Sequence, residues 1–123
     1  MPHQSRPDLV EKAIAASPRP QIQWNNAAFK KMRSDPELKG FTDVAVKQLL
    51  WDAICTRGLK CRARAETDED WLDKHPDDPW WYFVVIPVPE FPKGLFVKMK
   101  LLWEEGDLES DAFVEIINVH EEK

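Results

Sequence analysis

Hydrophobic positions in the first half of the chain recur at the spacing of α-helices. Apolar residues three and four positions apart predict helices over residues 8–16, 26–33 and 43–57. The third helix is the clearest, because Thr42 is a favourable N-cap and Gly58 stands where helices commonly end. The first half is therefore expected to be mainly helical, apart from a short extended segment at residues 21–24 that follows a proline-rich stop.

After Gly58 the hydrophobic pattern changes to the period of two that is typical of β-strands. Four strands are predicted, over residues 59–65, 80–88, 94–103 and 113–120. In the first of these, small apolar residues alternate with cations, so it should have one covered face and one basic face. The second is a continuous aromatic and β-branched run, which is typical of a strand buried on both faces. The acidic segment 66–79 between them is predicted to be a loop.

The order of these elements, three helices followed by about four strands, predicts an α+β fold. We expect the helices to pack on one face of a mostly antiparallel sheet, because helices and strands are segregated along the chain. A chain of 123 residues is long enough for a single domain with its own core, which we place at residues 7–123. Residues 1–6 are expected to form a loose N-terminal tail.

Charge is distributed unevenly along the chain. Residues 1–65 carry a net charge of +6 and residues 66–123 carry −11, which together give −5. The basic first half makes a polyanionic partner such as RNA worth testing, despite the acidic total. The acidic second half favours a different class, a non-enzymatic inhibitor such as an immunity or anti-defence protein. In that case the segments 66–78 and 104–111 would attract a basic protein partner.

Several classes of protein are disfavoured by features that the chain lacks. Its longest apolar run has nine residues, so we expect neither a transmembrane helix nor a secretory signal peptide, and we place the protein in the cytoplasm. Cys55 and Cys61 do not have metal-binding spacing, and we interpret both as small core residues. No glycine-rich phosphate loop or nucleophile elbow is present. We therefore expect neither a metal nor another cofactor.

Cations on the predicted strands are the main candidates for chemistry. Strand periodicity groups Lys60, Arg62 and Arg64 on one face, Lys98, Lys100 and Phe96 on another, and Asn118 with His120 on a third. Antiparallel pairing would bring such side chains to one surface, where cations contact phosphate oxygens and rings stack on unpaired bases. Metal-free RNA cleavage needs a base, an acid and a cation. His120 suits the acid or base role, because the unperturbed pKa of histidine is about 6.5.

Simpler alternatives stand beside this interpretation. The strand cations would be ordinary solvated residues if each were paired with an acid such as Glu115. Trp80, Trp81 and Tyr82 would be core residues rather than a ligand platform, since aromatic strands usually pack inside a protein. The chain would then be a small interaction domain without particular chemistry. Whether the cations converge in space distinguishes these alternatives.

The second half of the chain also contains three short motifs: DDPWWY at 77–82, GLFVKMK at 94–100 and INVHEEK at 117–123. In this order, behind a helical first half, they resemble the motility quorum-sensing regulator toxins (MqsR). More broadly they resemble the RelE-like group of small bacterial mRNA interferases. The resemblance implies a RelE-like fold and an endoribonuclease toxin that cleaves mRNA, free or engaged by the ribosome. It also implies neutralisation by an antitoxin protein.

The resemblance further implies roles for individual residues. Carried over by position, the family's cation after the third helix falls at Lys60 or Arg62, and its late basic residue falls at His120. The family's active-site tyrosine falls on Phe96, which has no hydroxyl, and its glutamine falls on Trp81. Together with the strand pattern, this assigns Lys60, Arg62, Lys98 and His120 to catalysis, and Arg57, Arg64, Lys100, Trp81 and Phe96 to RNA binding.

Overall fold

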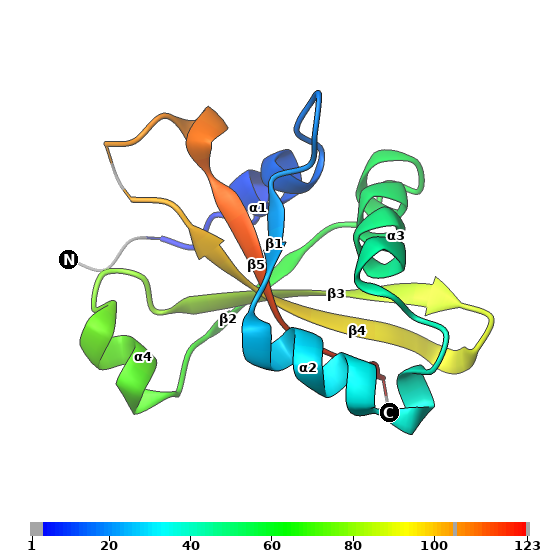
Figure 1. The fold of residues 1–123 in the computed structure, drawn as a ribbon. Helices are drawn as coiled ribbons and strands as arrows, with labels where there is room; N and C mark the ends of the chain where they lie inside the picture. Colours follow the sequence, from blue (N-terminus) through cyan, green and yellow to red (C-terminus); the bar gives the residue numbers. More distant parts are fainter. Residues whose placement is uncertain (1–3, 105, 123) are drawn as a thin grey trace.

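The computed structural model describes residues 4–104 and 106–122, and within them most helices precede the three longest strands (Figure 1). The α-helices are α1 (Pro7–Ile14), α2 (Asn26–Ser34), α3 (Asp43–Cys55) and α4 (Glu69–Lys74). The strands are β1 (Ile22–Trp24), β2 (Arg62–Ala65), β3 (Trp80–Val88), β4 (Phe91–Leu102) and β5 (Phe113–Glu121). Two short 3₁₀ turns, η1 (Pro36–Leu38) and η2 (Glu109–Asp111), precede α3 and β5.

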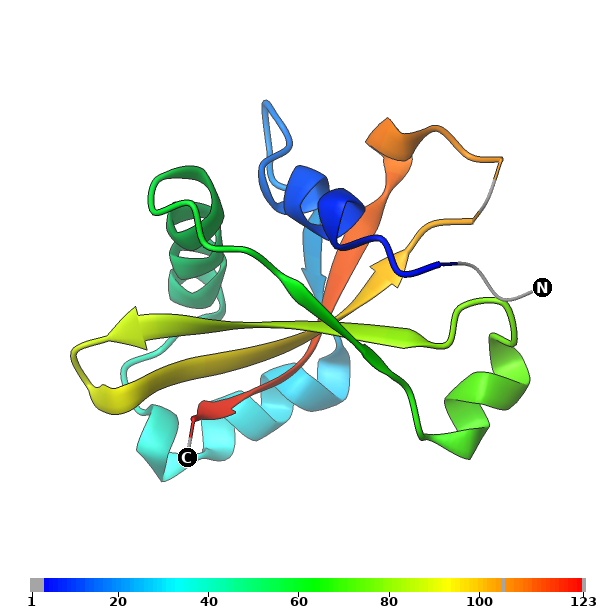
Figure 2. The ribbon, with the colours of Figure 1, turned by 180° about the vertical axis from the view of Figure 1, so that it is seen from behind.

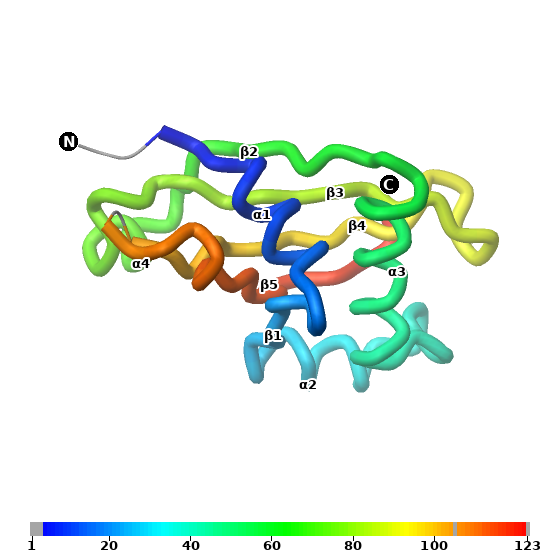
Figure 3. Tube along the Cα trace, turned by 90° about the horizontal axis from the view of Figure 1, so that it is seen from above, coloured from blue at the N-terminus to red at the C-terminus, as the bar shows by residue number. Residues whose placement is uncertain are grey.

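The five strands form one mixed sheet in the order β1-β5-β4-β3-β2. β1 runs parallel to β5, and the other neighbouring pairs are antiparallel. Figures 1 and 2 show α1 and α3 above the strands, and α2 and α4 below them at opposite ends. Seen from above, α1 and α3 lie across the sheet (Figure 3). Two helices thus cover one face of the sheet, while the opposite face is bordered by helices only at its ends.

Local sequence explains where the longer helices begin. The Thr42 hydroxyl accepts a hydrogen bond from the backbone N–H of Ala45 at 3.0 Å, which caps α3. The Asn25 side chain accepts hydrogen bonds from the N–H groups of Ala27 and Ala28 in the same way and caps α2. The Thr42 contact confirms the N-cap expected from the residue pattern, and Asn25 is of a residue type that commonly caps helices.

The hydrophobic core lies between the covered face of the sheet and the helices α1 and α3. Every second residue of the central strands is buried there, as the period of two requires. Tyr82 is the largest of the fully buried side chains, and its hydroxyl accepts a hydrogen bond from the N–H of Arg6 at 3.0 Å. Burial raises the pKa of Tyr82 to about 12. The Arg6 guanidinium also binds Asp8 and Glu109, so this residue is anchored rather than loose.

A β-bulge changes the alternation within β5. Lys98 of β4 pairs with Asn118, but the next residue, Met99, pairs with Ile116, so Ile117 is the extra residue. Val114 and Ile116 face the core before the bulge, and Val119 faces it afterwards. A regular strand would turn Val119 outward and its neighbours inward. The bulge therefore keeps Asn118 and His120 on the face opposite the core.

The structure confirms the α+β class, with helices near the three positions expected from the sequence. Several expectations were wrong. Residues 22–24 join the sheet as a fifth, parallel strand, and the segment 66–79 contains helix α4. Residues 80–88 form a strand with the expected bounds, but only one of its faces is buried, because no helix covers the middle of the other face. Cys61 is buried as expected, whereas Cys55 is exposed at the end of α3. Within the described part of the chain, no helix has both the length and the apolar character to cross a membrane.

Candidate functional site

Four neighbouring strands bring eight side chains to the uncovered face of the sheet. We call this set the open face: Arg62 and Arg64 of β2, Trp81 and Phe83 of β3, Phe96 and Lys98 of β4, and Asn118 and His120 of β5. One row crosses all four strands, because Arg62 pairs with Phe83, Phe83 with Lys98, and Lys98 with Asn118. The antiparallel register thus gathers residues that are up to 58 positions apart in the sequence.

Aromatic rings form a continuous stack in the middle of the open face. Phe96 stacks on His120 with 4.6 Å between ring centroids, and on Phe83 with 5.5 Å. Trp81 contacts Phe83 at 5.5 Å and approaches Phe96 edge-on at 6.3 Å. All four rings are partly exposed. Trp81 and Phe96, the two rings assigned to RNA binding, therefore lie together on the open face, and Phe83 and His120 extend the ring stack.

Cations surround this ring stack without carboxylate partners. The Lys98 ammonium lies 4.6 Å from the centroid of a Trp81 ring, and the Arg64 guanidinium lies 5.5 Å from that of Phe83. Among the described residues, Arg62, Arg64 and Lys98 form no ion pair. The open face therefore presents positive charge beside exposed rings.

The His120 ring is held in place by its own strand and by Phe96. Its Nδ1 atom lies 2.8 Å from the backbone oxygen of Glu121, which can only accept a hydrogen bond. For neutral His120 this contact assigns the proton to Nδ1 and leaves Nε2 as the acceptor. The arrangement is the one required of a general base that takes a proton through Nε2.

Lys100 lies on the same side of β4 as Lys98 but is buried. Its ammonium donates hydrogen bonds to a carboxylate oxygen of Glu66 at 2.9 Å and to the backbone oxygen of Trp80 at 3.1 Å. It also lies 4.0 Å from the centroid of a Trp71 ring. Desolvation lowers the pKa of Lys100, and the Glu66 carboxylate opposes that shift. The assignment of Lys100 to an RNA-binding surface is wrong, because its charge is enclosed beneath α4.

Other assigned residues are separated from the open face or from one another. Lys60 precedes β2 and reaches back to Glu11 of α1, with 3.6 Å between Nζ and Oε1. Arg57 donates a hydrogen bond to the backbone oxygen of Pro87 at the end of β3. Arg62 is on the open face, but it lies three strand spacings from His120, which is roughly 14 Å. The grouping of Lys60 and Arg62 with His120 around one reacting phosphate is therefore wrong, and Arg57 lies outside the face.

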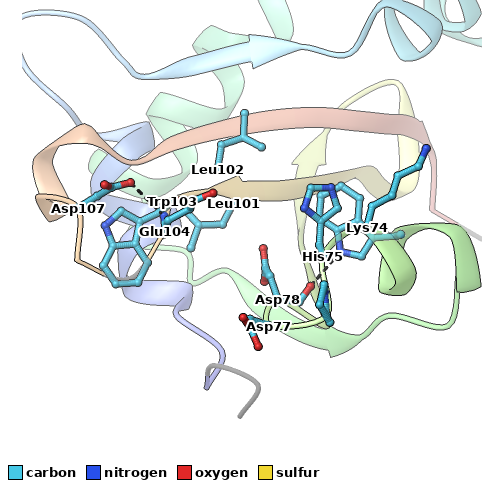
Figure 4. A pocket seen from close by; sticks show the side chains of 11 residues that line it. Lys74, His75, Asp77, Asp78, Leu101, Leu102, Trp103, Glu104 and Asp107 are labelled. Atoms are coloured by element: carbon cyan, nitrogen blue, oxygen red, sulfur yellow. Dashed lines mark hydrogen bonds between the residues drawn. The ribbon is translucent and has the colours of Figure 1, made fainter.

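A second region of interest is an acidic cleft between the α4 segment and the end of β4. Its volume is about 650 Å³, and it is lined by residues 71, 74–78, 101–104 and 107. Asp77, Asp78, Glu104 and Asp107 supply carboxylates to it, and Figure 4 shows Asp77 and Asp78 facing the same opening as Trp103. The cleft brings together parts of the two acidic segments that the sequence singled out. Asp68, Glu69 and Asp70 are not among its lining residues.

Two open-face residues had no assigned role in the sequence interpretation. Phe83 was hidden in a run of aromatic and β-branched residues that indicated complete burial. Asn118 was grouped with His120 by strand period alone, and its position opposite Lys98 depends on the bulge at Ile117. The apolar residues Val114, Ile116 and Val119 have the uneven spacing that a bulge produces, and that spacing was the available signal.

No group of three or more His, Cys, Asp or Glu side chains is placed to hold a metal ion, within residues 4–104 and 106–122. Comparison of the chain with protein-family models, with curated proteins and with solved structures finds no match. The resemblance to MqsR and RelE-like toxins therefore stays a prediction. The geometry of the open face has to support any functional proposal by itself.

Proposed function

We propose that this protein binds single-stranded RNA across the open face and cleaves it without a metal. It would thus be an endoribonuclease toxin of the RelE-like kind, acting on mRNA in the cytoplasm and neutralised by an antitoxin. The observation that carries the proposal is the ring stack of Trp81, Phe83, Phe96 and His120, flanked by the unpaired cations Arg62, Arg64 and Lys98.

Binding of single-stranded RNA uses both kinds of side chain. Unpaired bases stack on exposed aromatic groups, each base contributing about 1–3 kcal/mol, while Arg and Lys contact the phosphates between them. The rings of the open face already stack on one another, so a base would continue the stack next to His120. Arg62 and Arg64, at the other edge of the sheet, would then contact phosphates further along the strand.

Cleavage would use His120 and Lys98, which are diagonal neighbours on adjacent strands. Nε2 of His120 would accept the proton of a ribose 2′-hydroxyl, and the 2′-oxygen would form a bond to the adjacent phosphorus. The bond from phosphorus to the 5′-oxygen would break, and water would supply that oxygen with a proton. The Lys98 ammonium would stabilise the additional negative charge on the phosphate oxygens during this step.

The direct test is incubation of the purified protein with single-stranded RNA in the presence of a chelator. The proposal predicts cleavage that leaves 2′,3′-cyclic phosphate ends, and no cleavage of an RNA whose 2′-hydroxyls are methylated. Ribosome-engaged mRNA should be tested in parallel, and expression in bacteria should arrest growth. An absence of cleavage on both substrates, without growth arrest, would remove the enzymatic part of the proposal.

The acidic cleft supports a second candidate function, that of a non-enzymatic inhibitor which binds a basic protein. Carboxylates from both acidic segments converge there beside Trp103 and Trp71. An arginine or lysine side chain of a partner would find both carboxylates and aromatic faces in such a cleft. For this candidate, Asp77→Lys with Asp107→Lys should slow association with a basic partner and weaken its salt dependence. Unchanged association would contradict it.

A further inference from the structure

Strand β2 forms one edge of the sheet, and no strand of the described part of the chain pairs with its outer side (Figure 3). The N–H of Glu66 donates a hydrogen bond to the backbone oxygen of the residue before β3 at 2.7 Å. Because the hydrogen-bonded positions of an antiparallel ladder alternate, the backbone groups of Arg62 and Arg64 face β3 as well. The N–H and C=O groups of Ala63 and Ala65 therefore point away from the sheet, and we call them the β2 edge.

The chain itself covers this side of the sheet only just before β2. The N–H of Cys61 donates a hydrogen bond to a carboxylate oxygen of Glu11 at 2.9 Å, and by the same alternation it has the orientation of the β2 edge. No described residue makes such a contact with the backbone groups of Ala63 or Ala65. The first outward position is thus closed by a side chain of α1, and the next two are open to another strand.

The side chains that alternate with the β2 edge are basic. Arg62 and Arg64 are exposed, and they form no ion pair with any described residue. An antiparallel strand that bonds to the β2 edge would place its residues opposite Arg62 and Arg64 in closely spaced pairs, with about 4.5 Å between Cα atoms. Opposite charges in such a pair stabilise the pairing, and like charges destabilise it. Acidic residues at alternate positions of the added strand therefore match this edge.

A second copy of this chain matches the β2 edge less well. In a two-fold pair, Ala63 and Ala65 of one copy would bond to Ala65 and Ala63 of the other. This register places Arg64 directly opposite Arg64 of the second copy, so two like charges face each other across the strands. The basic side chains thus oppose pairing between identical edges, as charges on edge strands commonly do.

We propose that the β2 edge binds an extended acidic segment of another protein, which adds to the sheet as a sixth, antiparallel strand. Addition of a strand to an open edge is a common mode of peptide recognition, in which backbone hydrogen bonds give affinity and alternate side chains give specificity. Ala63 and Ala65 supply the backbone hydrogen bonds, and Arg62 and Arg64 select acidic residues. This protein-binding site goes beyond the proposed function, because it needs no RNA.

The test uses a labelled synthetic peptide of sequence Thr-Thr-Val-Glu-Val-Glu-Thr with blocked ends, and measures its binding by fluorescence anisotropy. In the proposed register its glutamates stand opposite Arg64 and Arg62, and its valines bond to Ala65 and Ala63. Replacement of both glutamates by lysine should weaken binding by about fivefold or more. N-methylation of both valines should also weaken it by about fivefold or more, because their N–H groups face the β2 edge. N-methylation of both glutamates, whose N–H groups point away, should change it little.

Variants of the protein provide the complementary test. Ala63→Pro removes an outward N–H but no hydrogen bond to β3, and proline is accepted on edge strands at such positions. It should abolish binding of the peptide, whereas Ala63→Ser keeps the N–H and should retain binding. Circular dichroism and thermal unfolding check that both variants fold. If Ala63→Pro does not fold, the N-methylated peptides decide the question with the wild-type protein.

Several results would overturn the proposal. These are a wild-type protein that does not bind the acidic peptide, equal or tighter binding of the lysine peptide, and binding that survives N-methylation of the valines or the Ala63→Pro substitution. Loss of binding on N-methylation of the glutamates would exclude the antiparallel strand. A dimer that forms without peptide and shifts the amide signals of Ala63 and Ala65 in NMR spectra would assign the β2 edge to a second copy instead.

Discussion

Lys98 and Lys100 stand two residues apart on the same side of β4, but their surroundings are opposite. The Lys100 side chain is 4% exposed, and its ammonium is enclosed by Glu66, the backbone of Trp80 and the ring of Trp71. The Lys98 ammonium lies over a Trp81 ring and has no ion pair among the described residues. Trp71 of helix α4 packs over the Lys100 ammonium, whereas the Lys98 side chain is partly exposed beside Trp81.

This difference separates a structural cation from a candidate functional one. A buried ion pair is destabilising to break, because the remaining charge is left without a partner in a place that water does not reach. A partly exposed lysine without a partner costs little to remove, but it is free to contact an anionic ligand. Sequence position and residue type are almost identical for the two lysines, so only the covering element distinguishes them.

The largest effect is expected from Lys100→Ala. It would leave the Glu66 carboxylate, 7% exposed, without its cation, and should lower the free energy of unfolding by about 3–5 kcal/mol. Lys98→Ala is the matched control and should change stability by less than about 0.5 kcal/mol. Chemical denaturation of both variants gives the two values. The double variant Lys100→Met with Glu66→Leu should recover most of the lost free energy of unfolding. If Lys100→Ala and Lys98→Ala lost equal amounts of this free energy, the contrast between the two lysines would be contradicted.

His120→Ala should have the next largest effect, on RNA cleavage. Loss of a general base lowers the cleavage rate by about 10²-fold or more, while RNA binding should fall less because three rings and three cations of the open face remain. His75→Ala is the matched control, since His75 stacks on Trp71 beside the acidic cleft, with 3.9 Å between ring centroids. Single-turnover cleavage assays would measure both, and an equal loss in the two variants would exclude the assigned role of His120.

Arg64→Ala should produce a moderate change in RNA binding. Removal of one phosphate contact should weaken binding to all sequences alike and reduce the slope of log K against log salt by about 0.7. Arg19→Ala removes an exposed arginine from the loop after α1 and should leave that slope unchanged. Titrations of each variant with RNA at several salt concentrations measure the two slopes. An unchanged slope for Arg64→Ala would place the RNA phosphates elsewhere.

The smallest effect is expected for Lys60→Ala, although the sequence assigned Lys60 to catalysis. Its side chain is 81% exposed, and its partner Glu11 lies on α1, away from the open face. Such a surface ion pair contributes about 0–1 kcal/mol to stability, and the variant should cleave RNA as the wild-type protein does. A loss of cleavage comparable to that of His120→Ala would show that the site extends around the edge of β2.

Much of the fold could be predicted because hydrophobic period and capping residues are local signals. Residues adjacent in the chain determine the bounds of β3, at Trp80 and Val88. They also determine the N-caps at Asn25 and Thr42. The parallel pairing of β1 with β5 could not be predicted in this way, since it joins residues about 90 positions apart. Helix α4 was missed because its six residues are mostly polar and bury no side chain completely.

The candidate site was predicted only in part, because strand alternation is also a local signal. Strand alternation put Arg62, Arg64 and Lys98 on strand faces, but it could not determine which element covers each face. The burial of Lys100 depends on Trp71 and Glu66, which belong to a segment expected to be a loop. The place of Asn118 depends on a bulge that interrupts the alternation. Non-local contacts therefore account for what the pattern alone missed.

The most direct test of the central claim follows the indole N–H signals of the six tryptophans by NMR during titration with single-stranded 2′-O-methyl RNA. Trp81 reports on the open face, Trp71 and Trp103 report on the acidic cleft, and Trp51 reports on α3. We predict that the Trp81 signal shifts in a saturable, salt-sensitive manner while those of Trp51, Trp71 and Trp103 change little. Shifts confined to Trp71 and Trp103, or no shift at Trp81 at saturating RNA, would contradict the assignment of RNA binding to the open face.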